Sequence, residues 1–276
     1  MSEERIDHMK YLPQMENIGS EIQDKVISEM ENYDPDKYTA NDVLEALKHD
    51  NITPEDFKAL LSPAALPLLE QICSKGTGRN KKTFWQFHLY VYTFIYCRII
   101  AITTVFTSGF NCHNKIHRAK LNMEEIEKEM QAIAETGLEE ILILTGESEK
   151  MSSVEYIGEA CKIAKKYFRM VGLEIYPVNS DQYAYLHECG VDYVTVFQET
   201  YNSDKYETLH LAGNKRIWPY RFNTQERALM GGMRGVGFAA LLVLTTLEKM
   251  LLPVVTTHIC YSVNIQRLKL LCLAHD

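Results

Sequence analysis

The chain has 276 residues, a formal net charge of −8 and a composition that is 46% hydrophobic, which is typical of a globular protein. This length accommodates one α/β barrel or two small domains. The net negative charge argues against a nucleic-acid partner, which requires a basic face. The seven cysteines include no CxxC pair. Their odd number, and the polar residues after Met1 in place of a signal peptide, indicate reduced thiols and a cytoplasmic location.

Residues 1–80 are predicted to form an N-terminal helical extension. Ser20, Thr39 and Thr53 each precede an amphipathic run and are typical N-caps. Pro54 and the Ser62-Pro63 pair place proline at first helical positions. No catalytic constellation is found here. We expect the extension to lead into a barrel, with a small partner-binding module as the alternative.

The stretch from 84 to 107 differs from the rest of the chain. It is rich in aromatic and β-branched residues and contains no acidic residue. One interpretation is a membrane segment, but Arg98 interrupts it, and an arginine at bilayer depth costs at least ~2.5 kcal/mol. A second interpretation is one or two buried strands. We expect no membrane association, and a third interpretation follows below.

Strands and helices alternate in the rest of the chain. Apolar runs predict strands, and amphipathic segments with caps predict the helices between them. This alternation predicts a parallel sheet, open or closed into a barrel. The predicted strands are 141–144, 171–178, 191–199 and 236–244.

Polar residues follow three of these strands. Gly146 and Glu147 end the first, Asn179 follows the second, and Gln198 and Glu199 end the third. Sites in parallel α/β folds are built at the carboxyl ends of the strands. Each residue taken alone is also explained as a solvated loop residue. Three strand ends in agreement favour a functional site.

Several segments of this part carry a family resemblance. They are GFNCHNKIHRAKL, LILTGESEKMS, LEIYPV, VTVFQETYN, LHLAGNKR and YRFNTQERALMGGMRGVGFAALL. Together they resemble the tyrosine lyases of thiamine biosynthesis, the 2-iminoacetate synthases, which are radical S-adenosylmethionine enzymes. The resemblance implies a partial or full (β/α) barrel. It also implies S-adenosylmethionine and a [4Fe-4S] cluster as cofactors, tyrosine as substrate, p-cresol and 2-iminoacetate (dehydroglycine) as products, and thiazole synthase as protein partner.

The same resemblance implies roles for particular residues. The segment Thr145, Gly146 and Glu147 would contact the methionine moiety of the cofactor, and Gly235 and Gly237 would allow backbone approach near the adenine. Gln198, Glu199 and Arg221 would act on cofactor and substrate as catalytic residues. Arg227 would hold a carboxylate, or would equally be a helix-surface residue.

The cluster motif of the family, CxxxCxxC, is missing. The pattern is expected just before Gly109, where residues 98–108 contain no cysteine and Cys97 stands alone. Cys112 does not match a ligand position, so we predict no metal ligands. Thiolates are the iron ligands of such clusters, so we expect this chain to be inactive as it stands.

Our hypothesis is that residues 85–108 are a family segment read in the wrong frame. With suitable codons, removing one base at the start of the Phe84 codon, one at the start of the Arg98 codon and one within the Ser108 codon restores a CxxxCxxC sequence. A similar change after about residue 242 would explain the tail. The expected domains are therefore an extension (1–80), an incomplete barrel core (81–244) and an aberrant, truncated C-terminal part (245–276).

Four functions remain open from the sequence. The first is a radical tyrosine lyase by descent. The second is a hydrogenase-maturation tyrosine lyase of the same superfamily, which adds a C-terminal cluster region that this chain does not show. The third is a non-catalytic barrel remnant, and the fourth is a membrane-tethered barrel that uses residues 84–107.

Overall fold

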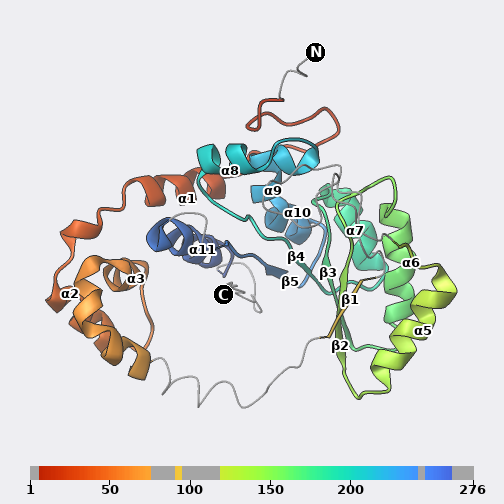
Figure 1. Cartoon of the computed structure of the whole chain (residues 1–276), viewed down its shortest axis with the longest axis horizontal. Coiled ribbons are helices and arrows are strands. Elements are labelled where there is room, and N and C mark those ends of the chain that lie inside the picture. Colours follow the sequence, from red (N-terminus) through yellow and green to blue (C-terminus); the bar gives the residue numbers. More distant parts are fainter. Residues whose placement is uncertain (1–5, 76–90, 95–118, 242–245, 263–276) are drawn as a thin grey trace.

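Five parallel strands form a single sheet in chain order, β1-β2-β3-β4-β5. The computed structural model describes residues 6–75, 91–94, 119–241 and 246–262 (Figure 1). A parallel sheet in sequential order, with helices on one face, is the predicted partial (β/α) barrel. The strands are β1 (Val91–Phe94), β2 (Glu140–Leu144), β3 (Met170–Glu174), β4 (Tyr193–Thr195) and β5 (Gly235–Gly237).

Helices precede, connect and follow the strands. Most of the helices expected from capping residues in the sequence begin at those residues. Thr39, Thr53 and Asn122 each form a reciprocal capping box with the acidic residue three positions later. The α-helices are α1 (Glu21–Glu31), α2 (Ala40–Lys48), α3 (Pro54–Leu61), α5 (Met123–Ala134), α6 (Val154–Ala164), α7 (Ser180–Glu188), α8 (Ser203–Leu209), α9 (Trp218–Phe222), α10 (Thr224–Met230) and α11 (Leu247–Ser262). Three 3-10 helices are η1 (Pro35–Lys37), η2 (Pro63–Leu68) and η3 (Asn214–Arg216).

The sheet has two chemically different faces because side chains alternate along each strand. Ile141, Ile143, Val171 and Leu173 belong to the main apolar core, together with residues of α5, α6 and α7. Residues of the opposite parity form the inner face of the barrel. There the ring of Tyr193 lies so close to Gly172 that an added Cβ would be 2.2 Å from it.

The described residues from Glu21 to Leu68 form helices and include a small core of their own. Val43, Ala59 and Ala65 are buried together between α2, α3 and η2. Helices α1 and α3 also pack against α11, so the last described helix lies against the N-terminal helices (Figure 1). Of the aromatic stretch 84–107, the described residues Val91–Phe94 form a strand paired with β2, as the second interpretation predicted.

The reading-frame hypothesis concerns residues 85–90 and 95–108, which lie outside the described part. No helix within the described residues is long and apolar enough to cross a membrane. The barrel strands are shorter than predicted: β3 ends at Glu174 and β4 at Thr195. Beyond those points the backbone turns into the loops that carry the polar residues. The three domain boundaries stay predictions.

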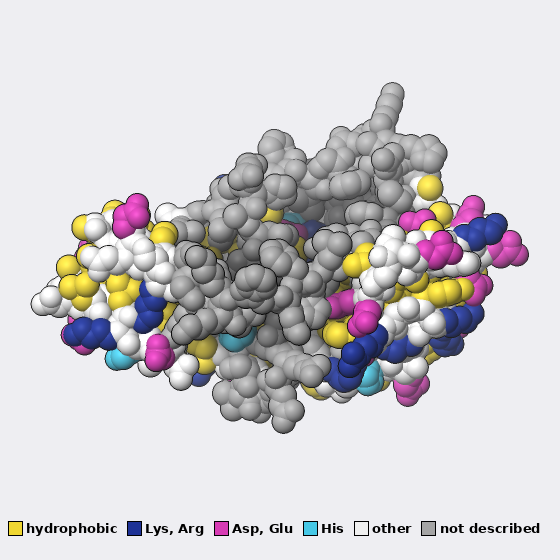
Figure 2. Space-filling view, turned by 90° about the horizontal axis from the view of Figure 1, so that it is seen from below, with side chains coloured by type: hydrophobic (Ala, Val, Ile, Leu, Met, Phe, Trp, Pro, Cys, Tyr) yellow, Lys and Arg dark blue, Asp and Glu magenta, His cyan; other side chains and the backbone are white. Residues whose placement is uncertain are grey.

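The outer helices are solvated by paired charges. Figure 2 shows acidic and basic side chains intermingled at the end of the molecule that carries α5 and α6. Lys166 of the α6–β3 turn reaches Glu127 of α5 at 3.1 Å, and Lys162 lies 2.7 Å from Glu159. Exposed pairs of this kind contribute less than about 1 kcal/mol each.

A buried carboxylate ties the amino-terminal ends of three strands together. Asp192, just before β4, accepts a hydrogen bond from the backbone N–H of Val171 at 2.9 Å. Its carboxylate also pairs with Lys165 at 2.8 Å and with Arg234, which immediately precedes β5. Burial would raise the pKa of Asp192, but the bonds from Lys165 and Val171 hold it below its usual value.

Replacing Asp192 with asparagine is therefore expected to lower the free energy of unfolding by about 1–3 kcal/mol, because it removes the charge that three donors share. Urea unfolding at pH 7 measures the loss. The matched control is Glu159→Gln in the exposed pair on α6, where we expect less than about 0.5 kcal/mol. Equal losses in the two variants would contradict the role given to Asp192.

Candidate binding site at the mouth of the barrel

Two carboxylates and two cations meet at the carboxyl ends of the strands. One oxygen of Glu147 lies 3.0 Å from Arg221 and 3.3 Å from Lys215. One oxygen of Glu199 lies 2.9 Å from Lys215 and 3.5 Å from Arg221. Each anion thus contacts both cations, and the four charges sum to zero. We call these four residues the mouth cluster.

Four different elements supply the mouth cluster. Glu147 lies in the loop after β2, whose first residue, Thr145, donates its backbone N–H to the carbonyl of Glu174 at 3.2 Å. Arg221 lies on α9 and is oriented by a bond from its Nε to the carbonyl of Phe197 at 2.6 Å. Lys215 belongs to η3, and its carbonyl accepts a hydrogen bond from the Tyr206 hydroxyl.

Glu199 reaches the mouth cluster from a strained backbone. Its φ of 67° lies in the left-handed region, which residues with a Cβ adopt at a cost of order 1 kcal/mol or more. The conformation is held by bonds on both sides: Gln198 N–H to the Ala239 carbonyl at 2.9 Å, and Leu241 N–H to the Glu199 carbonyl at 2.8 Å. Such strain is concentrated at functional positions in proteins.

The electrostatics of the mouth cluster favour its charged forms. Burial alone would raise the pKa of Glu199, but attraction to Lys215 and Arg221 lowers it to about 2. The pKa of Glu147 is lowered in the same way by Lys215 and Arg221 against the effect of burial. Both side chains are therefore carboxylates at neutral pH, and each is held by a charge-assisted hydrogen bond.

Two side chains beside the mouth cluster have buried polar atoms without partners. Gln198 is 3% exposed, and among the described residues neither its amide oxygen nor its amide nitrogen has a hydrogen-bond partner. His210 is also buried: its Nδ1 lies 3.0 Å from the Tyr206 carbonyl, and its Nε2 has no partner there. Burial lowers the pKa of His210 to about 4, so the imidazole is neutral. Buried polar atoms of this kind are ready to bind a ligand.

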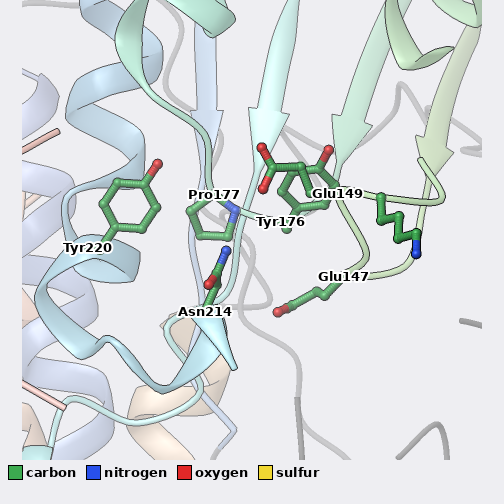
Figure 3. A pocket seen from close by; sticks show the side chains of 7 residues that line it. Glu147, Glu149, Tyr176, Pro177, Asn214 and Tyr220 are labelled. Carbon is green, nitrogen blue, oxygen red and sulfur yellow. The ribbon is translucent and has the colours of Figure 1, made fainter. Parts of the chain in front are cut away.

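A cavity of about 390 Å³ opens beside Glu147, within the size range of small-molecule sites. Figure 3 shows Tyr220 and Pro177 on one side and Glu147 on the other, with Tyr176 and Glu149 overlapping between them in this view. Asn214, next to Lys215, also lines it. The cavity therefore has aromatic walls and contains one carboxylate of the mouth cluster, that of Glu147.

The structure brings together three of the predicted site residues, Glu147, Glu199 and Arg221. Thr145 and Gly146 lie in the same loop, where the Gly146 carbonyl accepts the Ser152 hydroxyl at 3.3 Å. Their predicted contact with a cofactor stays a prediction.

The two glycines predicted to lie near the adenine are in the sheet. Gly235 pairs with Tyr193, and Gly237 pairs with Thr195. A Cβ on Gly237 would lie 2.5 Å from the Thr195 hydroxyl oxygen, so packing within the sheet already requires glycine at this position. Their role at a ligand stays a prediction.

Two predicted roles are corrected. Asn179 does not join the mouth cluster; it caps α7 and accepts bonds from the Glu16 N–H at 3.0 Å and the Tyr220 hydroxyl at 2.8 Å. Arg227 is fully buried, so it is not a helix-surface residue. Its guanidinium donates to the carbonyls of Val178 and Tyr220 and lies over the Tyr220 ring, which makes it a packing residue.

Sequence reasoning did not assign Lys215 or His210 to the site. Both lie in the LHLAGNKR segment, which contributes to the family resemblance but carries no catalytic motif. The one feature of this segment that indicates a turn is Gly213. Its φ of 80° lets the chain turn back toward the strand ends. A lysine next to such a turn has no distinctive spacing, and only the fold shows which carboxylates it meets.

The parallel sheet in chain order, with its candidate site at the carboxyl ends of the strands, defines the class of the fold as a partial (β/α) barrel. The crystal structure of HydG, a maturase of the [FeFe]-hydrogenase, shares this fold with a TM-score of 0.80. The comparison covers 91% of this chain and 57% of that one at 21% identity, so it concerns the fold alone. No model of a known protein family matches the chain.

The sequence comparison is more specific. The chain is 32% identical to 2-iminoacetate synthase of Escherichia coli (strain K12) and 31% identical to that of Salmonella typhimurium, over 204 residues in both cases. Each match covers 74% of this chain and 54% of the relative, so the chain spans about half the length of the curated relatives it matches. Over the matched residues the chain is a relative of the 2-iminoacetate synthases, as the resemblance predicted.

The mouth cluster predicts an acid-sensitive contribution to stability. The pKa of Glu199 is about 2 in the folded chain and about 4.3 when unfolded. Its stabilisation is therefore complete above the unfolded value and is lost as the pH falls toward 2. In Glu199→Gln, the decrease in unfolding free energy between pH 5 and pH 2.5 should be smaller by roughly 2–3 kcal/mol. Urea unfolding at several pH values measures this difference.

The control for this measurement is Glu188→Gln, because Glu188 is exposed at the end of α7. Its pH profile should run parallel to that of the wild-type chain. A Glu199→Gln profile that also ran parallel to the wild type would contradict the pairing of Glu199 with Lys215 and Arg221.

Proposed function

We propose that this barrel descends from a radical S-adenosylmethionine tyrosine lyase and keeps that enzyme's site for zwitterionic amino-acid groups. The ligands would be L-tyrosine and the methionyl part of S-adenosylmethionine. The complete activity would form 2-iminoacetate and p-cresol, with 2-iminoacetate passed to a thiazole synthase in the cytoplasm. Identity of 32% to 2-iminoacetate synthase supports this proposal.

The observation that carries the proposal is the mouth cluster. A zwitterion has one carboxylate and one ammonium group, and the cluster offers both cations and carboxylates within 3.5 Å of one another. A ligand carboxylate binds well to an arginine fork, and a ligand ammonium to a carboxylate. Gln198 adds a donor and an acceptor that the described residues leave unused.

S-adenosylmethionine fits these residues, whereas the [4Fe-4S] cluster of the family does not. The sequence contains no CxxxCxxC. The four described cysteines lie apart: Cys161 is buried on α6, Cys189 is buried at the end of α7, Cys260 is half-buried on α11, and Cys73 is exposed. No group of three possible metal ligands occurs within the described ranges.

The missing thiolates also favour a second candidate, a non-catalytic barrel that binds the ligands without cleaving them. The comparisons favour a 2-iminoacetate synthase over a hydrogenase-maturation lyase. The likeness to HydG is one of fold at 21% identity, while the sequence match is to 2-iminoacetate synthase.

One prediction concerns the iron content of the purified chain. After anaerobic reconstitution with iron and sulfide, the purified chain should carry no [4Fe-4S] cluster, because three thiolates at the required spacing are absent. Iron analysis and visible absorbance measure this. About four irons per chain, together with a thiolate-to-iron charge-transfer band, would show that other residues of the chain provide the ligands.

The second prediction tests the lyase by restoring the family segment. In a chain whose residues 84–109 carry CxxxCxxC and whose frame continues past 242, we expect p-cresol from tyrosine in the presence of reductant and S-adenosylmethionine. Chromatography of the products measures it. In the restored chain, Glu147→Ala should weaken S-adenosylmethionine more than tyrosine, by roughly 1.5–3 kcal/mol.

The matched control is the same restored chain with the three cysteines changed to serine. It should give no p-cresol and leave S-adenosylmethionine uncleaved. A restored chain that cleaves S-adenosylmethionine but forms no p-cresol would show that the substrate is not tyrosine.

A further inference from the structure

Glu174 is an ionisable residue on the inner face of the barrel, to which the sequence assigned no role. It is the last residue of β3 and lies two positions after Gly172, so it shares the face covered by the Tyr193 ring. Its register partner on β2 is Leu144, and the pairing of Leu173 with Val194 makes Thr195 its neighbour on β4. Both flanking side chains are uncharged.

Glu174 is a carboxylate without a cation of its own. The charged groups around it are Arg221 on α9, Lys215 on η3 and Glu199 after β4. The two cations are already shared between Glu147 and Glu199. With Glu174 included, three carboxylates face two cations. Within the described residues the side chain of Glu174 forms no hydrogen bond or ion pair.

The surroundings of Glu174 favour its neutral form. Burial raises the pKa of Glu174; Arg221 and Lys215 oppose this effect, and Glu199 adds to it. A carboxyl group whose pKa is raised by folding stabilises the fold below its unfolded value and loses that contribution as the pH rises through the folded value. Near neutral pH, the charged form of Glu174 therefore works against folding unless a cation is supplied.

We propose that Glu174 binds the ammonium group of the amino-acid ligand, an inference that rests on the proposed function. The ligand carboxylate then faces Arg221 and Lys215, whose positive charge the mouth cluster holds in place. The next residue of the same parity, Tyr176, lines the cavity beside Glu147. A ligand whose ammonium lies at Glu174 thus has its side chain beside the aromatic walls of Tyr176 and Tyr220.

This arrangement couples ligand binding to a proton. When an ammonium group arrives, the fraction of Glu174 that carries a proton releases it to solvent, and the resulting carboxylate pairs with the ammonium. Affinity for an amino acid should therefore rise with pH over the range in which Glu174 titrates. A ligand of the same shape without the ammonium should show no such rise.

The experiment compares L-tyrosine with 3-(4-hydroxyphenyl)propionate, which lacks the amino group, using ligand-observed NMR titrations at several pH values between 5 and 8. In Glu174→Gln, tyrosine should bind about 10–100-fold more weakly than to the wild-type chain, the range expected for one hydrogen bond to a charged group. The propionate should bind both proteins within about twofold. The rise of tyrosine affinity with pH should disappear in the variant.

Glutamine has the shape of protonated glutamate, so the variant should fold, and its thermal melt checks this. Glu174→Asp keeps the charge and should retain the pH dependence. If both ligands weaken equally, or if tyrosine affinity is unchanged, Glu174 does not bind the ammonium. If the wild-type chain binds neither ligand, the proposed amino-acid site itself is wrong, and this inference fails with it.

Discussion

The mutual neutralisation of Glu147, Glu199, Arg221 and Lys215 is the constraint on which the mouth of this barrel depends. An isolated charge taken out of water costs several kcal/mol, and opposite charges in contact offset much of that cost. The side chain of Arg221 is only 6% exposed, and those of Lys215, Glu199 and Glu147 are 15–19% exposed. The two cations therefore keep Glu147 and Glu199 ionised at these depths, while the guanidinium of Arg221 is charged in any case.

This constraint explains why the N-terminal segment lies across the same end of the barrel. Lys215 lies on η3, which has only three residues. So short a helix has few backbone hydrogen bonds of its own to fix its position. The neighbouring Arg216 is buried, and it donates to the carbonyls of Ile6 at 2.6 Å and His210 at 2.8 Å. The Trp218 N–H donates to the His8 carbonyl at 2.9 Å. Residues 6–8 thus hold in place the loop that delivers a cation to the site.

Most of the fold was predictable from the sequence because it depends on local patterns. Capping residues such as Thr39, Thr53 and Asn122 fix where helices begin, and the short apolar run from Ile141 to Leu144 predicts a covered strand. The site was predictable in part. Glu147, Glu199 and Arg221 follow from strand ends and family resemblance. Asn179 obeyed the same rule, yet it turns to the N-terminal segment, whose path no periodicity reveals.

Lys215 and Glu174 show a different limit of sequence reasoning. Their importance lies in which charges they meet, and those partners are 16 or more positions away along the chain. Glu174 reads as the polar end of a strand until the register places it between Leu144 and Thr195. An unpaired carboxylate becomes recognisable only when the cations nearby are known to be occupied.

The charged mouth and the missing thiolates belong to different parts of the chain. Residues 144–241 build the mouth and residues 6–16 brace it, whereas the family's thiolate motif would lie just before Gly109. Ion pairs at the mouth need no iron, since Glu147 and Glu199 already have cations within 3.5 Å. The amino-acid recognition proposed for this mouth would therefore not depend on the part of the chain where the family's thiolate motif is expected. That separation allows the ligand-binding role proposed for these charges to be tested in this chain without any chemistry on the ligand.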